Sequence, residues 1–276
     1  MPELTDISAL PPIPWKDHSP TALDYRSVPV DFADPRFVEP LVDVADYGIA
    51  GEGYYARTDG LNAPYYRSFP SAPHKIWCRG TVAGHLVRVN AALEPCGVEL
   101  YALDGFRPVA VQEELWAFFL AQAKTALDRP SAKACEEFAG TYCSDPRNYD
   151  PEDSRKWPVH VTGGAVDVTL RCVGSREPLY MGGIFDDPSD VSHTAHFERK
   201  LEKLDGKAHA LSASDAAALH NRRLLYWAMS GAGFVNYPYE WWHFDLGTQL
   251  WVLDGGTDNA GKTERMAWYG PTAIPI

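Results

Sequence analysis

The sequence predicts an α+β fold in which a single domain follows an extended N-terminal arm. The chain has 276 residues, of which 45% are hydrophobic and 22% are charged, a composition typical of folded globular proteins. Segments with helical and with strand periodicity follow one another without the strict order of a βαβ protein. The sequence shows no internal repeat or low-complexity tract, so these periodicities indicate the fold class.

The N-terminal segment, residues 1–41, is rich in proline and acidic residues and contains PPIP and DFADPRF. Proline lacks a backbone donor and suits neither a helix interior nor a central strand, so we expect an extended arm lying on the domain. Regular periodicity begins at about Val42. We therefore assign residues 42–276 to the domain.

Three helices are predicted from apolar residues at a spacing of three and four. Residues 80–95 have this pattern and stop at Pro95, and residues 109–127 have enough of it for one buried face. Residues 212–230 begin with a Ser-x-x-Asp capping pattern and end near Gly231, which predicts a capped helix.

Strands are predicted where apolar and polar residues alternate. Residues 98–103 alternate and run into an Asp-Gly turn, and residues 164–173 combine β-branched residues with a glycine-rich entry. The tail has two strand-like runs, WWHFDL at 241–246 and LWVLDGG at 250–256. Residues 128–157 are polar, charged and interrupted by prolines, which favours a loop insertion.

Charge and targeting signals exclude several classes of partner. Lys and Arg number 25 against 37 Asp and Glu, and the formal charge of −12 does not suit a nucleic-acid-binding protein. The first twenty residues have neither a basic n-region nor an apolar h-region, and no 18 apolar residues run together. We expect a cytoplasmic protein with no membrane partner, and the odd number of cysteines, five, indicates free thiols.

Three short motifs carry the residues suited to catalysis: DGFRP at 104–108, HVTGGAVD at 160–167 and EWWH at 240–243. A catalytic zinc site needs three His, Asp or Glu ligands and an open position for water. Two histidines and one aspartate from these motifs meet that need. A glutamate beside the metal can accept a proton from water, and a fixed arginine can stabilise a developing oxyanion. The residues in these roles are His160, Asp167, His243, Glu240 and Arg107.

Each motif alone also has a structural interpretation. HVTGGAVD is compatible with a turn capped by its aspartate, and EWWH with an aromatic core strand. DGFRP is compatible with a turn whose arginine forms a surface ion pair. A single motif therefore does not establish a metal site.

Together and in this order, the motifs resemble those of the D-alanyl-D-alanine dipeptidases of vancomycin resistance and of related zinc D,D-peptidases. Three further segments extend the resemblance over residues 42–250: YARTD at 55–59, MGGIFD at 181–186 and NRRLL at 221–225. The resemblance implies a central, mainly antiparallel sheet flanked by helices.

The resemblance also implies a site. One zinc ion per chain would be held by His160, Asp167 and His243, with Glu240 as general base and Arg107 steadying the tetrahedral intermediate. Asp186 and Tyr55 would hold the free ammonium group of a dipeptide. The activity implied is attack of zinc-bound water on a short D,D-dipeptide such as D-alanyl-D-alanine, whose physiological role the sequence does not define.

Two other functions stay open at this point. One is a zinc carboxypeptidase or amidase acting on another small amide that contains a D-amino acid. The other is a non-catalytic sensor of cell-wall fragments, which the presence of Glu240 disfavours because a sensor needs no base.

Departures from the family pattern lie next to the first histidine. Pro158 stands where the family motif has serine, and Val161 and Thr162 replace a more polar pair, so we expect an altered rim around the substrate. The arm at 1–40 and the stretches 128–157 and 187–212 are long for a minimal dipeptidase, and would form lids or oligomer contacts.

Other chemically suggestive groups are interpreted as structural. His193 and His196 are spaced for a second metal pair on a helix, but a polar loop or surface is the preferred interpretation. GTDNAGKT at 256–263 fits the phosphate-loop pattern, yet Gly270-Pro271 follows too soon for a nucleotide-binding helix, so we expect a hairpin loop. Trp241 and Trp242 are expected to wall the zinc site.

Overall fold

The structure is a computed structural model, and it describes residues 4–5, 10–15, 25–256 and 265–275. Its central sheet has five strands and is flanked by helices, which confirms the predicted α+β class. Its strand order is β2-β4-β5-β7-β6, in which only the β2–β4 pair is parallel. The expectation of a mainly antiparallel sheet is therefore confirmed. The strands are β2 (Ala50–Gly51), β4 (Val98–Asp104), β5 (Ala165–Cys172), β6 (Val235–Asn236) and β7 (His243–Asp245), and a separate pair joins β1 (Leu41–Asp43) to β3 (Trp77–Arg79).

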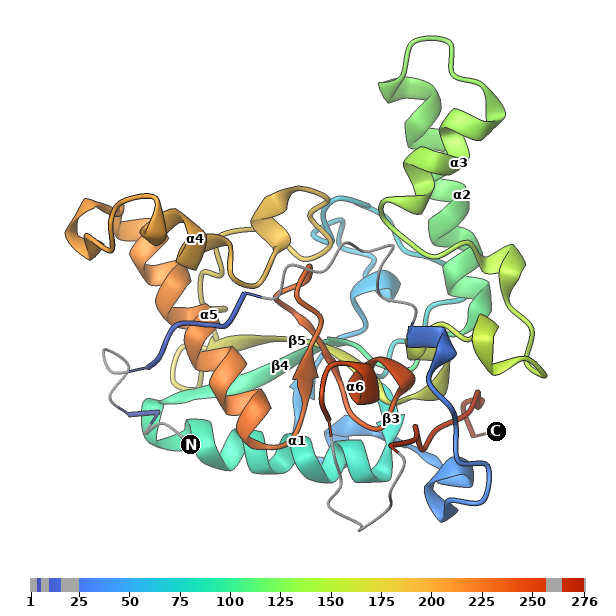
Figure 1. Cartoon of the computed structure of the whole chain (residues 1–276), viewed down its shortest axis with the longest axis horizontal. Helices are drawn as coiled ribbons and strands as arrows, with labels where there is room; N and C mark the ends of the chain where they lie inside the picture. The colour runs from blue at the N-terminus through green and yellow to red at the C-terminus, as the bar shows by residue number, and fades with distance from the viewer. Residues whose placement is uncertain (1–3, 6–9, 16–24, 257–264, 276) are drawn as a thin grey trace.

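Helices flank this sheet, and the three predicted ones are confirmed. Figure 1 shows α1 running along one edge of the molecule with α5 crossing it, whereas α2 and α3 project together from the body. Among the described residues, none of the helices combines the length and the apolarity needed to cross a membrane. The helices are α1 (Gly80–Leu93), α2 (Val109–Ala126), α3 (Ala132–Gly140), α4 (His196–Glu202), α5 (Ala213–Gly231) and α6 (Gln249–Leu253).

The core forms where α1 and α5 pack on β4 and β5. The inner face of α1 buries Leu86, Val89 and Leu93 at helical spacing, in the same core cluster as Leu100 of β4 and Leu170 of β5. Each such side chain contributes roughly 1.5–3 kcal/mol when it is fully removed from water. This packing fixes the strands that carry the motif residues.

Two local predictions were wrong. The stretch 128–157, predicted as a loop, contains α3, whose first turn is capped by the Ser131 hydroxyl accepting from the Ala134 N–H. The run 250–256, predicted as a strand, lies largely within α6, because the Thr248 hydroxyl accepts from the Trp251 N–H and starts a helix. In both cases a local cap decided the conformation.

The N-terminal arm lies on the domain where the structure describes it. The backbone N–H of Ile13 donates to Glu198, and the Trp227 indole donates to the carbonyl of Pro11. These contacts agree with an arm that packs on α4 and α5, while the boundary at residue 41 stays a prediction.

Arg222 of α5 organises the segment 181–193. Its guanidinium is buried and donates to the carbonyl oxygens of Met181, Val191 and His193 at 2.7–2.8 Å. One arginine therefore fixes both ends of a segment that lacks regular strand or helix over most of its length.

Replacing Arg222 with methionine is expected to destabilise the protein by about 4 kcal/mol, because three buried carbonyl groups lose donors at about 1–3 kcal/mol each. Urea unfolding of the variant measures this loss. Arg88→Met, on the exposed face of α1, is the matched control. A loss equal to that of the control would contradict the role assigned to Arg222.

Candidate active site

Three neighbouring strands bring the motif residues side by side. Asp167 of β5 pairs with Asp104 of β4 on one side and with His243 of β7 on the other. Directly paired residues in a sheet project to the same face, so residues from three distant motifs meet at one point.

The glycines of HVTGGAVD return the chain from His160 to Asp167. His160 lies in the short 3₁₀ helix Val159–Thr162 (η10), which ends at Gly163 with φ of 72°. A Cβ atom at Gly163 would lie 2.5 Å from Leu41, and the left-handed conformation itself favours glycine. The sequence therefore needs glycine here to place His160 above β5.

His160, Asp167 and His243 form a buried triad whose donor atoms lie within 4.8 Å of one another. His160 Nε2 lies 3.1 Å from His243 Nδ1, which lies 3.0 Å from Asp167 Oδ1, and His160 Nε2 is 3.6 Å from Asp167 Oδ2. Zinc bonds of about 2.0–2.1 Å place neighbouring ligands of a tetrahedron about 3.3 Å apart. The three residues thus fit a mononuclear zinc site.

Hydrogen bonds to the outer nitrogens orient both rings. His160 Nδ1 lies 2.8 Å from the carbonyl oxygen of Gly105, and His243 Nε2 lies 2.9 Å from the Asp245 carboxylate. With a proton on each outer nitrogen, His160 Nε2 and His243 Nδ1 present lone pairs to the triad. Metal-binding histidines commonly have such second partners.

The electrostatics of the triad favour a cation. Burial and the nearby Arg107 lower the pKa of His160 to about 3, so its ring is neutral, as metal binding requires. Burial alone would lower the pKa of His243, but the Asp245 and Asp167 carboxylates raise it well above its usual value. The carboxylates thus stabilise positive charge at this point.

Glu240 lies beside the triad without belonging to it. Its Oε2 is 3.7 Å from His243 Nδ1, and its side chain keeps 35% of its surface exposed toward the cavity. Withdrawal from bulk water raises the pKa of the Glu240 carboxyl to about 7, and the carboxylates of Asp167 and Asp186 also raise it. A cation bound to the triad would lower this pKa again and favour the carboxylate form.

Arg107 connects the triad to the rest of the site. Its Nε donates to Asp104 at 2.7 Å, and its Nη2 donates to Asp167 Oδ2 at 3.2 Å and to the Tyr55 hydroxyl at 3.0 Å. Its Nη1 has only a long contact of 3.4 Å, to Gln112. This nitrogen therefore keeps donor capacity toward the cavity that Arg107 lines.

Asp186 lines the same cavity, next to Tyr55 and Tyr65. The hydroxyls of Tyr55 and Tyr65 both donate to its Oδ2 at 2.8 Å, which leaves Oδ1 available. Burial raises the pKa of Asp186 to about 6, and its backbone has φ of 56°. Desolvation without a full counter-charge suits a group that awaits a cationic ligand.

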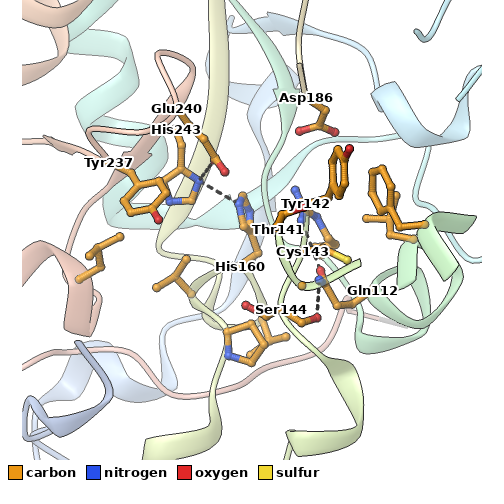
Figure 2. A pocket seen from close by; sticks show the side chains of 18 of the residues that line it. Gln112, Thr141, Tyr142, Cys143, Ser144, His160, Asp186, Tyr237, Glu240 and His243 are labelled. Atoms are coloured by element: carbon orange, nitrogen blue, oxygen red, sulfur yellow. Dashed lines mark hydrogen bonds and ion pairs between the residues drawn. The ribbon is translucent and has the colours of Figure 1, made fainter. Parts of the chain in front are cut away.

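The two histidines of the triad, Glu240, Arg107 and Asp186 line one cavity of about 420 Å³. Figure 2 shows the rings of His160 and His243 facing each other with Glu240 beside them, while Asp186 lies on another wall. The segment 141–144, which follows α3, forms a further wall. The ring of Tyr142 stacks on that of Phe119, with 4.3 Å between the ring centroids. The insertion at 128–157 thus contributes to the site.

The other groups singled out in the sequence lie elsewhere. Trp241 and Trp242 are buried in the core and do not line the cavity. His193 ends a 3₁₀ turn and His196 begins α4, in neither case as part of a metal cluster among the described residues. The segment GTDNAGKT lies, apart from Gly256, outside the described residues.

Asp245 and Tyr65 are among the residues of the site that were missed from the sequence. Asp245 stands two positions after His243 on β7. Alternate residues of a strand point to the same face, so the sequence pattern predicts that both side chains lie on one face of the sheet. Tyr65 is separated from Asp186 by 121 residues, and no local pattern links them.

The α+β fold and the buried triad beside Glu240 define the class of metal-dependent hydrolases. A model of the D-ala-D-ala dipeptidase family matches residues 42–259. The chain belongs to this family, which confirms the resemblance seen in the motifs and the prediction of a D-Ala-D-Ala dipeptidase-like metallopeptidase.

Curated relatives of this chain are named D-alanyl-D-alanine dipeptidases. The chain is 28% identical to a D-alanyl-D-alanine dipeptidase of Synechocystis sp. over 184 residues, which cover 65% of this chain and 71% of the relative. It is 31% identical to that of Escherichia coli over 150 residues, 54% of this chain and 56% of the relative. A solved vancomycin-resistance D,D-pentapeptidase in complex with Zn(II) matches 62% of this chain and 72% of its own, at 15% identity and a TM-score of 0.35.

Proposed function

We propose that the protein hydrolyses the amide bond of a short D,D-dipeptide such as D-alanyl-D-alanine in a zinc-dependent reaction. The observation that supports this most strongly is the buried triad of His160, Asp167 and His243. Glu240 lies beside it, with its Oε2 3.7 Å from His243 Nδ1. Membership of the D-ala-D-ala dipeptidase family supports the substrate class.

The triad would hold one zinc ion through His160 Nε2, His243 Nδ1 and Asp167 Oδ1. Zinc bound there would supply Lewis acidity, which lowers the pKa of water and polarises a carbonyl group. Glu240 would accept the proton of the attacking water at its carboxylate and pass it to the leaving amine. Arg107 would donate from Nη1 to the oxygen that gains negative charge.

Asp186 and Tyr55 would position the substrate. The free ammonium group of the dipeptide would bind the available Oδ1 of Asp186, whose other oxygen is occupied by two tyrosines. Tyr55 receives a hydrogen bond from Arg107 and donates one to Asp186, so it couples the ammonium site to the triad.

Replacing Asp186 with asparagine is expected to reduce the preference for a free over an N-acetylated D,D-dipeptide by about 10–100-fold, the value of one charged hydrogen bond. The preference is measured as the ratio of kcat/KM for the two substrates. Asp190→Asn, an exposed residue nearby in the chain, is the matched control. An unchanged ratio would contradict the assignment of Asp186.

The proposal is tested with D-Ala-D-Ala, L-Ala-D-Ala, L-Ala-L-Ala and N-acetyl-D-Ala-D-Ala as substrates for zinc-loaded protein. Cleavage of the free D,D-dipeptide alone supports it. Cleavage of other small amides instead would favour the alternative of a carboxypeptidase or amidase, which the apolar Pro158 and Val161 in the cavity wall motivate. Binding without turnover would identify a sensor.

A further inference from the structure

The cavity carries a second arginine that the proposed mechanism does not use. Arg26 lies in the 3₁₀ turn Tyr25–Ser27 (η3), through which the N-terminal arm contributes to the cavity lining. Arg107, the other arginine of this lining, is committed to Asp104 and Asp167. Within the described part of the chain, the Arg26 guanidinium has no ion pair and lies over the ring of Tyr25 at 4.8 Å.

The backbone around Arg26 is held in place from two sides. The Gln249 side chain of α6 donates to the carbonyl oxygens of Arg26 and Val28 at 3.3 and 2.7 Å. The Tyr25 hydroxyl donates to the carbonyl oxygen of Trp157, next to Pro158. The arm therefore presents a half-buried arginine at a fixed point of the cavity wall.

The lining segment 158–161 follows Trp157, whose carbonyl oxygen accepts from the Tyr25 hydroxyl. Pro158, Val159 and Val161 of this segment have no polar side chain, and the His160 ring belongs to the triad. Proline also lacks a backbone N–H. Among the described residues that line the cavity, Arg26 and Arg107 are the two with a permanent positive charge. Because Arg107 is bound to Asp104 and Asp167, an anionic ligand group away from the triad would find its charged partner in Arg26.

We propose that Arg26 binds the C-terminal carboxylate of the substrate, so that the site selects dipeptides with both ends free. This rests on the proposed function. The ammonium and carboxylate of a dipeptide lie on opposite sides of the scissile amide. Asp186, which accepts from Tyr55 and Tyr65, would bind the ammonium group. Arg26, which the N-terminal arm contributes to the cavity lining, would bind the carboxylate.

The charges of the protein and of the cavity explain why this contact would add to the affinity. A net charge of −12 and the carboxylates of Asp186 and Glu240 in the cavity disfavour an anionic ligand group. A guanidinium offers a carboxylate two parallel hydrogen bonds, which are stronger than those between neutral groups.

The test is equilibrium binding to zinc-loaded protein in which Glu240→Gln prevents turnover. Titration calorimetry compares D-Ala-D-Ala with its C-terminal amide, in chains that carry either Arg26 or the substitution Arg26→Gln. We expect Arg26→Gln to weaken binding of D-Ala-D-Ala by about tenfold and to leave binding of the amide unchanged, as one charged contact predicts. Arg26→Lys should restore part of the loss, and Arg88→Gln on α1 is the surface control.

Equal weakening of both ligands by Arg26→Gln would overturn the inference, because it would indicate a structural role of the arm. No effect on either ligand, or no binding of either, would overturn it as well. The proposed function is judged separately, by turnover of D-Ala-D-Ala with Glu240 in place, so the two failures are distinguishable.

Discussion

Replacing Glu240 with glutamine is expected to lower kcat for D-Ala-D-Ala by about a thousandfold, the scale of a lost general base. Glutamine keeps the size of the side chain but cannot accept and return a proton. Because Glu240 is 3.7 Å from His243 Nδ1 and outside the triad, zinc binding should persist. Steady-state kinetics on the zinc-loaded variant, with the metal content of the same sample, measures both effects.

The control for Glu240 is Glu114→Gln, which changes a carboxylate that bonds Ser71 on the exposed surface. It should keep wild-type kcat. If Glu240→Gln retained wild-type kcat with zinc bound, Glu240 would not be the base. Loss of zinc from the variant would instead place Glu240 among the ligands.

Replacing Asp245 with asparagine is expected to weaken zinc binding by about 10–100-fold, the usual effect of removing an outer partner of a metal ligand. The Asp245 carboxylate is fully buried, accepts from the Thr248 hydroxyl and lies 2.9 Å from His243 Nε2. Without its charge, the proton on Nε2 is less firmly fixed and Nδ1 is a weaker donor to the metal.

Competition with a chromogenic chelator measures the zinc affinity of Asp245→Asn. At saturating zinc its kcat should return to within about threefold of wild type, which separates metal binding from chemistry. Asp205→Asn, at an exposed turn, is the control. An unaltered zinc affinity would show that Asp245 does not act through His243.

The sequence predicted the elements whose signals are local. The helix at 212–230 was found because the Ser212 cap and the apolar periodicity lie within the helix itself, and the structure confirms the Ser212 hydroxyl as acceptor from Asp215 N–H. The helix α3 was missed because nine residues between proline-rich segments hold too few turns for periodicity. Short elements depend on caps and tertiary packing more than on pattern.

The same distinction holds for the site. The triad was foreseeable because each of its residues stands in a distinctive motif, and strand pairing then joins Asp167 to His243. Tyr65, Arg26 and the wall at 141–144 meet the cavity only through long-range packing. Their own segments carry no spacing that links them to the triad, so sequence alone gave no signal.

The most direct test of zinc-dependent dipeptide hydrolysis is the release of D-alanine from D-Ala-D-Ala while metal-free protein is titrated with zinc. The three proposed ligands predict activity that rises in proportion to added zinc and reaches its plateau at about one equivalent per chain. Full activity in the metal-free protein, or none at saturating zinc, would contradict the account.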